Sequence, residues 1–289
     1  MSKFLDFFVA EVAKTKWNMF SVAHMCGSEE PEVLHFQANN PCQDTYSVAK
    51  AFTVTAVGLL VDRGLLSVDE TVTAILAEEC PEDYHPYWDD TTVHMVLLHQ
   101  LGLPGNCLDI DAQDAREFGS DYLRYMMTHP LSCPAGGELC YTDAAYYLLS
   151  RIVEKRSGMK LDDFLWRELF EPLGFREAAW SHCPLGHAMG ATGLYIRVED
   201  MAKLGWLYLN GGVWKDRRIL SQAWVDTVIE NGYELRPKGV GKAYSKGGMY
   251  GQMLLVIPEE NRVVAWQAFG KDKDIDLAAI IAAYRDQEA

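Results

Sequence analysis

The two ends of the chain have mirrored patterns of predicted secondary structure. Apolar residues recur at helical spacing over residues 4–13, and a second short amphipathic helix is predicted over 275–285. Between each of these helices and the middle of the chain lie two strand-like segments separated by turn residues. The four predicted strands are 18–27, 32–39, 251–258 and 262–269. The simplest packing joins both hairpins in one antiparallel sheet that the two terminal helices cover.

The middle of the chain is mostly helical. Apolar residues with a 3.6-residue period predict helices over 51–64, 92–98, 142–157, 161–169 and 198–209. We therefore predict an α+β fold, in which an antiparallel sheet built from both chain ends carries an inserted, mostly helical subdomain. The predicted sheet subdomain is 1–45 with 187–289, the helical subdomain is 46–186, and the two form one compact catalytic unit.

Charge and hydropathy exclude several classes of partner. The 289 residues include 26 Lys and Arg against 41 Asp and Glu, which gives a net charge of −15. Such a protein repels phosphate, so we predict that it binds neither nucleic acid nor an anionic membrane. Asp6 and Glu11 interrupt the apolar residues of a would-be signal peptide, and the longest apolar stretch, 51–61, is about half a membrane span. A cytoplasmic protein is expected.

The cysteine and histidine spacings give no local metal motif. None of the seven cysteines forms a C-x-x-C pair, and a cytoplasmic protein is expected to keep them as free thiols. The histidines form no H-E-x-x-H motif, and the pairs His94/His99 and His182/His187 are five residues apart, which does not place two ligands on one helix face. We predict neither a metal site nor a cofactor.

The pattern Ser-x-x-Lys occurs twice. Ser157 and Lys160 lie beside Gly158 after a predicted helix, which is typical of a helix C-terminus. Ser47 and Lys50 instead open the most apolar helix of the chain, where residues three apart are neighbours on one face. A buried lysine can take the proton of a serine hydroxyl and make it a nucleophile. The alternative is a serine that caps the helix beside a lysine that reaches solvent.

Two further segments carry polar groups next to loops. Tyr141 and Asp143 lie between a Pro/Gly-rich loop and a helix, where Thr142 or Asp143 could equally be a helix cap. Lys246 is followed by Gly247 and Gly248 before an apolar strand. Glycines beside a lysine let a ligand approach the backbone closely, although a glycine bulge on an edge strand has the same pattern.

Taken in order, the three segments resemble those of the penicillin-recognising serine hydrolases. This family includes serine β-lactamases, especially class C, with DD-peptidases and related esterases. Ser47 to Lys50 is similar to its S-x-x-K motif, Tyr141 to Asp143 to its Y-x-N motif, and Lys246 to Gly248 to its K-T-G motif. Segments 97–104, 148–175 and 193–220 also resemble the family, so the similarity extends over roughly residues 30–270.

The resemblance implies a β-lactamase/DD-peptidase-like fold and a role for each motif residue. Ser47 would be acylated, Lys50 would activate it, and Tyr141 would relay protons. Lys246 would attract a substrate carboxylate, and the backbone N–H groups of Ser47 and Met249 would form the oxyanion hole. The expected substrate is a small molecule or short peptide that carries a carboxylate and whose reacting bond is an amide, a β-lactam or an ester.

Two motif residues depart from the family pattern. Asp143, Gly247 and Gly248 are predicted to line the substrate site, but Asp143 replaces an Asn and Gly247 replaces a Thr. A carboxylate at 143 favours the charged form of Lys50 and opposes its role as a base. We therefore expect weak β-lactam turnover. The alternatives are a catalytically impaired member that binds a ligand or regulates, and a metal-dependent hydrolase on the same fold.

Overall fold

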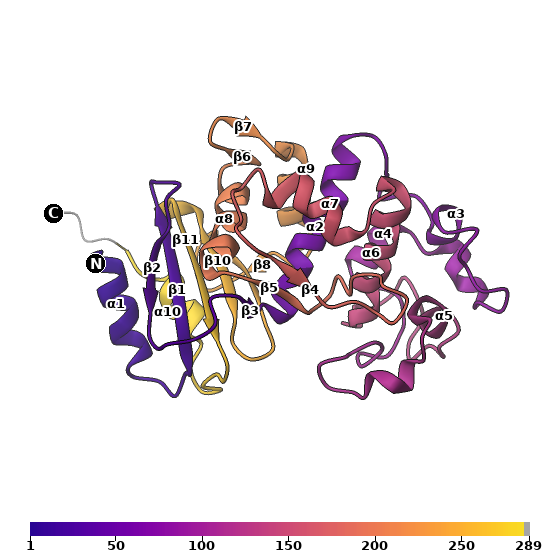
Figure 1. Cartoon of the computed structure of the whole chain (residues 1–289), viewed down its shortest axis with the longest axis horizontal. Helices are drawn as coiled ribbons and strands as arrows, with labels where there is room; N and C mark the ends of the chain where they lie inside the picture. The colour runs from indigo at the N-terminus through magenta and orange to yellow at the C-terminus, as the bar shows by residue number, and fades with distance from the viewer. Residues whose placement is uncertain (286–289) are drawn as a thin grey trace. The chain divides into compact units, whose positions relative to one another are not determined.

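The computed structural model describes residues 1–285, which form two compact units (Figure 1). The sheet unit comprises Met1–Val48, Leu173–Ala178 and Tyr195–Ala289, and the helical unit comprises Ala49–Pro172 and Ala179–Leu194. The sequence placed the divisions at 45/46 and 186/187 and did not separate 173–178 from the helical part. The last four residues of the predicted sheet subdomain, 286–289, lie outside the described residues.

A six-stranded sheet in the order β2-β1-β11-β10-β9-β8 forms the centre of the sheet unit. Its neighbouring strands pair antiparallel, and β1 from the N-terminal hairpin pairs with β11 from the C-terminal one, with Val22 opposite Trp266. The strands are β1 (Met19–Cys26), β2 (Glu32–His35), β8 (Arg236–Pro237), β9 (Tyr244–Gly247), β10 (Met253–Ile257) and β11 (Arg262–Ala268). The prediction of one antiparallel sheet built from both chain ends is confirmed.

Helices cover both faces of this sheet (Figure 1). Successive strand residues point to opposite faces, so Leu255 and Trp266 share one apolar cluster with α1 (Lys3–Val12) and α10 (Leu277–Ala282). The opposite face, which includes Leu254 and Val263, packs against α8 (Val198–Leu209). Both terminal helices therefore lie where the sequence pattern predicted.

The closest approach of α8 to the sheet depends on Gly205. A Cβ atom at this position would lie 2.7 Å from Val263 Cγ1 and 2.8 Å from Leu254 Cδ1. Gly205→Ala should therefore lower the free energy of unfolding by about 1–2 kcal/mol, because overpacking outweighs the better helix propensity of Ala. Urea unfolding measures this change, with Gly137→Ala as the control, since a Cβ there meets its nearest neighbour at an ordinary 3.4 Å. An unchanged or raised midpoint for Gly205→Ala would contradict the expectation.

Shorter elements complete the sheet unit. β3 pairs antiparallel with β5, with Asp44 opposite Tyr195, and β6 pairs with β7. These elements are β3 (Gln43–Asp44), β5 (Leu194–Ile196), β6 (Val213–Trp214), β7 (Arg217–Arg218), α9 (Gln222–Asn231) and the 3₁₀ turns η1 (Tyr46–Val48) and η5 (Pro258–Glu260). The short β3 strand leads directly into η1, which contains Ser47.

Two long helices form the core of the helical unit. α2 (Ala49–Asp62) is buried on all sides from Ala49 to Leu60 and packs against α6 (Asp143–Ser157). A helix that is apolar all round is expected only in a core, which explains why this segment showed no polar face in the sequence. The other elements are α3 (Val72–Ile75), η2 (Pro86–Asp90), α4 (Val93–Leu97), η3 (Ala115–Phe118), α5 (Tyr122–Met127), α7 (Leu161–Leu165), the π-helical turn η4 (Trp166–Phe170) and β4 (Ala179–Trp180).

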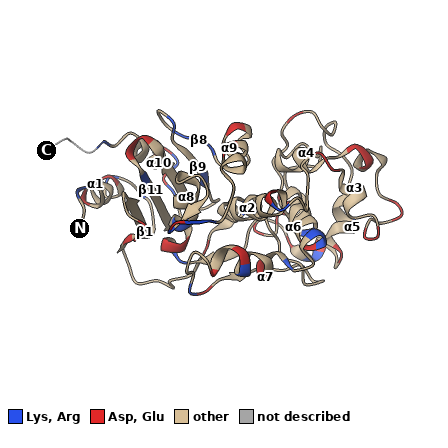
Figure 2. Ribbon diagram, turned by 90° about the horizontal axis from the view of Figure 1, so that it is seen from above, with Lys and Arg blue, Asp and Glu red and all other residues tan. Residues whose placement is uncertain are grey.

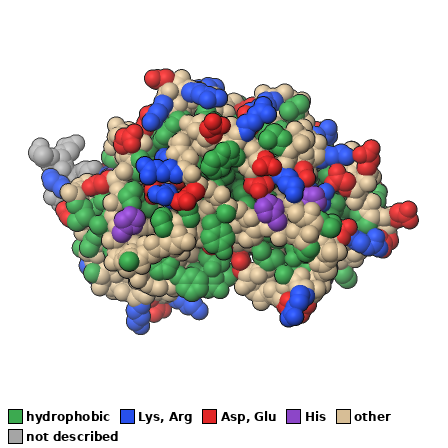
Figure 3. All heavy atoms as spheres, in the orientation of Figure 1, with side chains coloured by type: hydrophobic (Ala, Val, Ile, Leu, Met, Phe, Trp, Pro, Cys, Tyr) green, Lys and Arg blue, Asp and Glu red, His purple; other side chains and the backbone are tan. Residues whose placement is uncertain are grey.

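Charged residues of both signs are interspersed along the described chain (Figure 2) and on the face drawn in Figure 3. Many of the basic residues are held in ion pairs, such as Arg151 of α6 with Glu79 and Lys155 with Glu78. Within residues 1–285, no helix combines the length and the apolar character that crossing a membrane requires.

Candidate active site

Ser47 lies in a tight 3₁₀ turn immediately before α2. Its neighbour Tyr46 has a φ of 47°, an unfavourable conformation for a bulky residue, and the Tyr46 N–H donates to Asp44 Oδ1 at 2.8 Å. The Val48 N–H donates to the Thr45 carbonyl at 3.1 Å and closes the turn. Strained backbone of this kind persists only where the surrounding structure holds it in place, and it is common at functional sites.

The glycine-rich segment passes next to this turn within the sheet unit. β9, which ends with Lys246 and Gly247, packs against η1. A Cβ atom on Gly248 would lie 2.8 Å from the Thr45 carbonyl oxygen, so a side chain at 248 would push the two segments apart. β9 lies between β8 and β10, but its pairing with β8 covers only Tyr244 and Ser245, so the edge-strand alternative stays open at Lys246 and Gly247. Met249, the predicted oxyanion-hole residue, follows in the turn with 40% of its surface exposed.

Lys246 forms an ion pair with Glu234. Glu234 is 1% exposed and has a φ of 65°, and the Lys246 side chain is 11% exposed. The positive charge that the motif supplies is thus matched by a buried carboxylate from the same unit. Sequence reasoning missed Glu234, which belongs to no motif and precedes Lys246 by twelve residues.

In the helical unit, Lys50 lies fully buried between acidic and aromatic groups. Its Nζ atom is 2.6 Å from Asp143 Oδ1 and 3.0 Å from the Ala191 carbonyl oxygen, and it lies 4.8 Å from the centre of the Tyr141 ring. The structure therefore brings Lys50 together with Tyr141 and Asp143, which follow it by more than 90 residues in sequence. A lysine that reaches solvent, the alternative for this position, is wrong.

The start of α6 separates the roles of two neighbouring residues. Thr142 is the N-cap, and its Oγ1 accepts from the Ala144 N–H at 3.4 Å. Asp143 is the first helical residue and directs its carboxylate to Lys50. The capping alternative is therefore correct for Thr142, while the carboxylate of Asp143 forms an ion pair with Lys50.

His99 supports the segment that carries Tyr141. The Thr142 N–H donates to His99 Nδ1 at 3.3 Å, and the Cys140 N–H donates to the His99 carbonyl at 2.9 Å. The imidazole ring lies 4.4 Å from the Tyr141 ring, centre to centre. Sequence reasoning placed His99 in a family-like segment without assigning it a contact, so this supporting role emerges only from the structure.

Two more carboxylates lie close to Asp143. The carboxylates of Asp109, Asp111 and Asp143 come within 4.8 Å of one another, and the Thr192 hydroxyl donates to Asp111 Oδ2 at 2.5 Å. Burial, followed by the charge of Asp143, raises the pKa of Asp109. Burial also raises the pKa of Asp111, against the lowering effect of the Thr192 hydroxyl. Carboxylates of this kind can bind a divalent cation, but the Lys50 ammonium already lies against Asp143.

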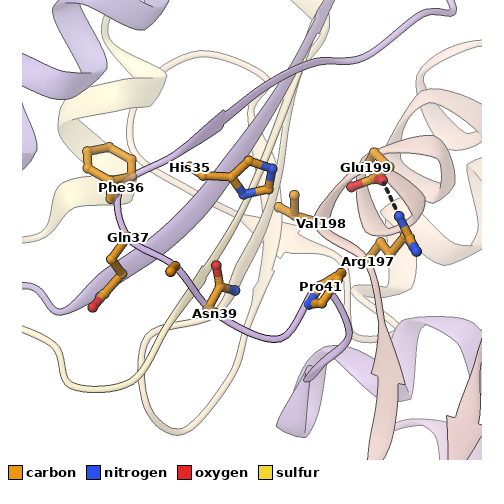
Figure 4. A pocket seen from close by; sticks show the side chains of 9 residues that line it. His35, Phe36, Gln37, Asn39, Pro41, Arg197, Val198 and Glu199 are labelled. Carbon is orange, nitrogen blue, oxygen red and sulfur yellow. Dashed lines mark ion pairs between the residues drawn. The ribbon is translucent and has the colours of Figure 1, made fainter.

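A separate pocket of about 560 Å³ opens in the sheet unit (Figure 4). It is lined by residues 35–39, 41 and 197–199 and includes none of the predicted site residues. Arg197 lies 2.6 Å from Glu177 and 3.8 Å from Glu199, the second contact being the dashed line in Figure 4. Since two carboxylates already surround its one guanidinium group, the pocket is not a strong anion site.

The fold and the motif residues together define a class of serine hydrolase. The sequence model of the family described as β-lactamase matches residues 42–284, which is most of the chain. This chain therefore belongs to the β-lactamase family, and the resemblance noted from the motifs is confirmed.

Individual proteins show the same relationship. The chain is 26% identical over 266 residues to a 6-aminohexanoate-dimer hydrolase of Paenarthrobacter ureafaciens, a match that covers 79% of this chain and 66% of that protein. It thus spans slightly less than two thirds of the length of this relative. Among solved structures, a class C β-lactamase superposes with a TM-score of 0.74 at 16% identity, covering 99% of this chain and 96% of that one. A penicillin-binding protein homologue from Caulobacter crescentus superposes with a TM-score of 0.73 at 15% identity, covering 96% and 95%.

Proposed function

We propose that this protein is a serine acyl-transfer hydrolase that acts on small amides or esters through an acyl-Ser47 intermediate. The observation that carries the proposal is the contact of the buried Lys50 with the buried Asp143 and the half-buried Tyr141, at the first turn of the helix that Ser47 precedes. A fully buried lysine beside a tyrosine is the arrangement expected for activating a serine hydroxyl.

In the proposed reaction, Lys50 accepts the hydroxyl proton of Ser47 as its Oγ attacks the substrate carbonyl. The backbone N–H groups of Ser47 and Met249 stabilise the negative charge on the carbonyl oxygen. When the bond to the leaving group breaks, Tyr141 passes the proton to the leaving nitrogen or oxygen. Water then attacks the acyl-Ser47 ester, releases the acid and restores the serine hydroxyl.

The ion pair of Lys246 with Glu234 bears on the substrate class. A substrate carboxylate at Lys246 would compete with a carboxylate that is already in contact and buried. The family-derived expectation of a substrate with a carboxylate is therefore weakened, and the missing hydroxyl at Gly247 acts in the same direction. We propose neutral short-chain esters and amides as the preferred substrates, with β-lactams turned over poorly.

Labelling of Ser47 tests this proposal directly. A fluorophosphonate reacts with an activated serine, and intact mass spectrometry of the folded protein should show one adduct that peptide mapping places on Ser47. A neutral ester substrate should compete with the fluorophosphonate for Ser47 and slow the labelling. The absence of an adduct with both a fluorophosphonate and a fluorescent penicillin would argue for the second candidate function, a ligand-binding or regulatory module.

The contact between Asp143 and Lys50 is the specific observation that favours this second candidate. The carboxylate stabilises the charged ammonium, so Asp143→Asn should increase the neutral fraction of Lys50. We expect acylation at pH 7 to be faster by about tenfold, and the acidic limb of its pH profile to move to lower pH. Measuring the acylation rate from about pH 5 to 9 checks both effects.

A matched control isolates the position of the charge. Asp163→Asn removes a carboxylate from the exposed surface of α7 and should leave the profile unchanged. If neither the parent protein nor Asp143→Asn forms an adduct, the result favours the binding module. If both react at the same rate, Asp143 does not control the charge of Lys50.

A further inference from the structure

Two cysteines bracket the loop that leads to Tyr141. Cys133 and Cys140 are free thiols whose Sγ atoms lie 2.6 Å apart. A disulfide has an S–S bond of about 2.05 Å, so the pair can be joined by a shift of well under 1 Å. We call residues 133–140 the thiol loop, and its second cysteine is the direct chain neighbour of Tyr141.

The thiol loop is held against one segment of the helical unit at both ends. The Ser132 and Cys133 N–H groups donate to the Gly102 carbonyl, at 2.8 and 3.3 Å, and the Cys140 N–H donates to the His99 carbonyl at 2.9 Å. A Cβ atom on Gly102 would lie 2.3 Å from the Cys133 carbonyl oxygen, so only glycine permits this close approach. These backbone contacts hold the two ends of the loop so that the two Sγ atoms lie in contact.

Both sulfurs can meet a small reagent from solvent. Each cysteine is partly exposed, and residues 136–139 between them are exposed. The hydrogen bond with Cys133, then burial and the nearby Glu138 carboxylate, raises the pKa of Cys140. Cys140 therefore keeps its proton more readily than an ordinary thiol.

We propose that Cys133 and Cys140 form a reversible disulfide that sets the mobility of the thiol loop and, through Cys140, of Tyr141. The closed ring contains eight residues, and cross-linking it removes open conformations of the loop that the dithiol form can visit. The disulfide itself is independent of catalysis. Its effect on acylation rests on the function proposed above.

The oxidant we name is hydrogen peroxide. The thiolate of one cysteine, taken here as Cys133, attacks one peroxide oxygen, the O–O bond breaks, and the products are a sulfenic acid and hydroxide, which takes up a proton to become water. The Cys140 sulfur then attacks the sulfenic sulfur, forms the S–S bond and expels the hydroxyl group as a second water. Two thiols and one peroxide thus give one disulfide and two waters. A dithiol reductant reverses the change.

Thiol counting and amide hydrogen exchange test the proposal without any need for activity. After mild peroxide treatment and unfolding in an alkylating agent, five cysteines rather than seven should be alkylated, and peptide mapping should show a Cys133–Cys140 link. Amide exchange across residues 133–142 should slow by on the order of tenfold in the oxidised protein and recover with dithiothreitol. Fluorophosphonate labelling of Ser47 should change reversibly by several-fold.

Serine variants provide the controls. Cys133→Ser and Cys140→Ser should each abolish the link and the exchange effect, whereas Cys42→Ser, which alters another partly exposed cysteine, should retain both. Seven alkylated cysteines after peroxide, or links to other cysteines, would overturn the disulfide. A disulfide that forms without slower exchange over 133–142 would overturn the control of loop mobility. Absence of labelling in both redox states contradicts only the proposed function.

Discussion

Ser47→Ala is expected to abolish fluorophosphonate labelling and to lower ester turnover by at least about 10³-fold. Alanine removes the hydroxyl that forms the acyl intermediate, while the strained turn at Tyr46 and its backbone hydrogen bonds remain. The partly exposed serine contributes little packing, so the urea midpoint should hardly move. Intact mass spectrometry, ester hydrolysis and urea unfolding of the same preparation measure these three effects.

The second Ser-x-x-Lys sequence supplies a matched control. Ser157 ends α6, where its Oγ accepts from the Met159 N–H at 3.1 Å, and Gly158 follows in a left-handed conformation. Ser157→Ala should label and hydrolyse like the parent protein. Full labelling of Ser47→Ala, or loss of labelling in Ser157→Ala, would show that Ser47 is not the nucleophile.

Lys50→Met should remove both the activity and a large part of the stability. Loss of the proposed base is expected to reduce acylation by about 10²–10⁴-fold. The substitution also leaves the buried Asp143 carboxylate without the ammonium at 2.6 Å, which should cost about 3–5 kcal/mol of unfolding free energy. Urea unfolding and labelling kinetics measure the two losses separately.

Combining Lys50→Met with Asp143→Asn separates structure from catalysis. Removing both charges eliminates the unpaired carboxylate, so most of the stability should return while acylation stays low. Recovery of acylation in the double variant would show that Lys50 is needed for folding and is not the base. Lys160→Met, in the other Ser-x-x-Lys sequence, should leave both quantities close to the parent values.

The sheet could be predicted because its determinants are local. Alternating apolar residues and turn residues mark β1, β10 and β11, and helical spacing marks α1 and α8, so these elements begin and end within a few residues of their predicted limits. By contrast, β8 comprises only Arg236–Pro237, too short to show a pattern. Without β8, the sequence left β9 open as an edge strand.

The motif residues were predictable for a different reason. Ser47, Lys50 and the Tyr141 to Asp143 segment carry a recognisable pattern, and the structure brings Lys50, Tyr141 and Asp143 together. The partners that modify them have no such pattern. Glu234, which pairs with Lys246, has a backbone with positive φ that its sequence does not indicate. Asp109 and Asp111 lie close to Asp143 although more than 30 residues separate them from it in sequence. In retrospect, the alternating acids at 109 and 111 were the one available signal.

The contact of His99 with the backbone of Thr142 fixes the protonation state of the imidazole. The Thr142 N–H points to Nδ1, so this nitrogen must present a lone pair and the ring hydrogen belongs on Nε2. A hydrogen on Nδ1 would remove the acceptor of this hydrogen bond, next to the ring that lies against Tyr141. The neutral Nε2–H tautomer is therefore a requirement of the fold at this position, and imidazole nitrogen chemical shifts would report it directly.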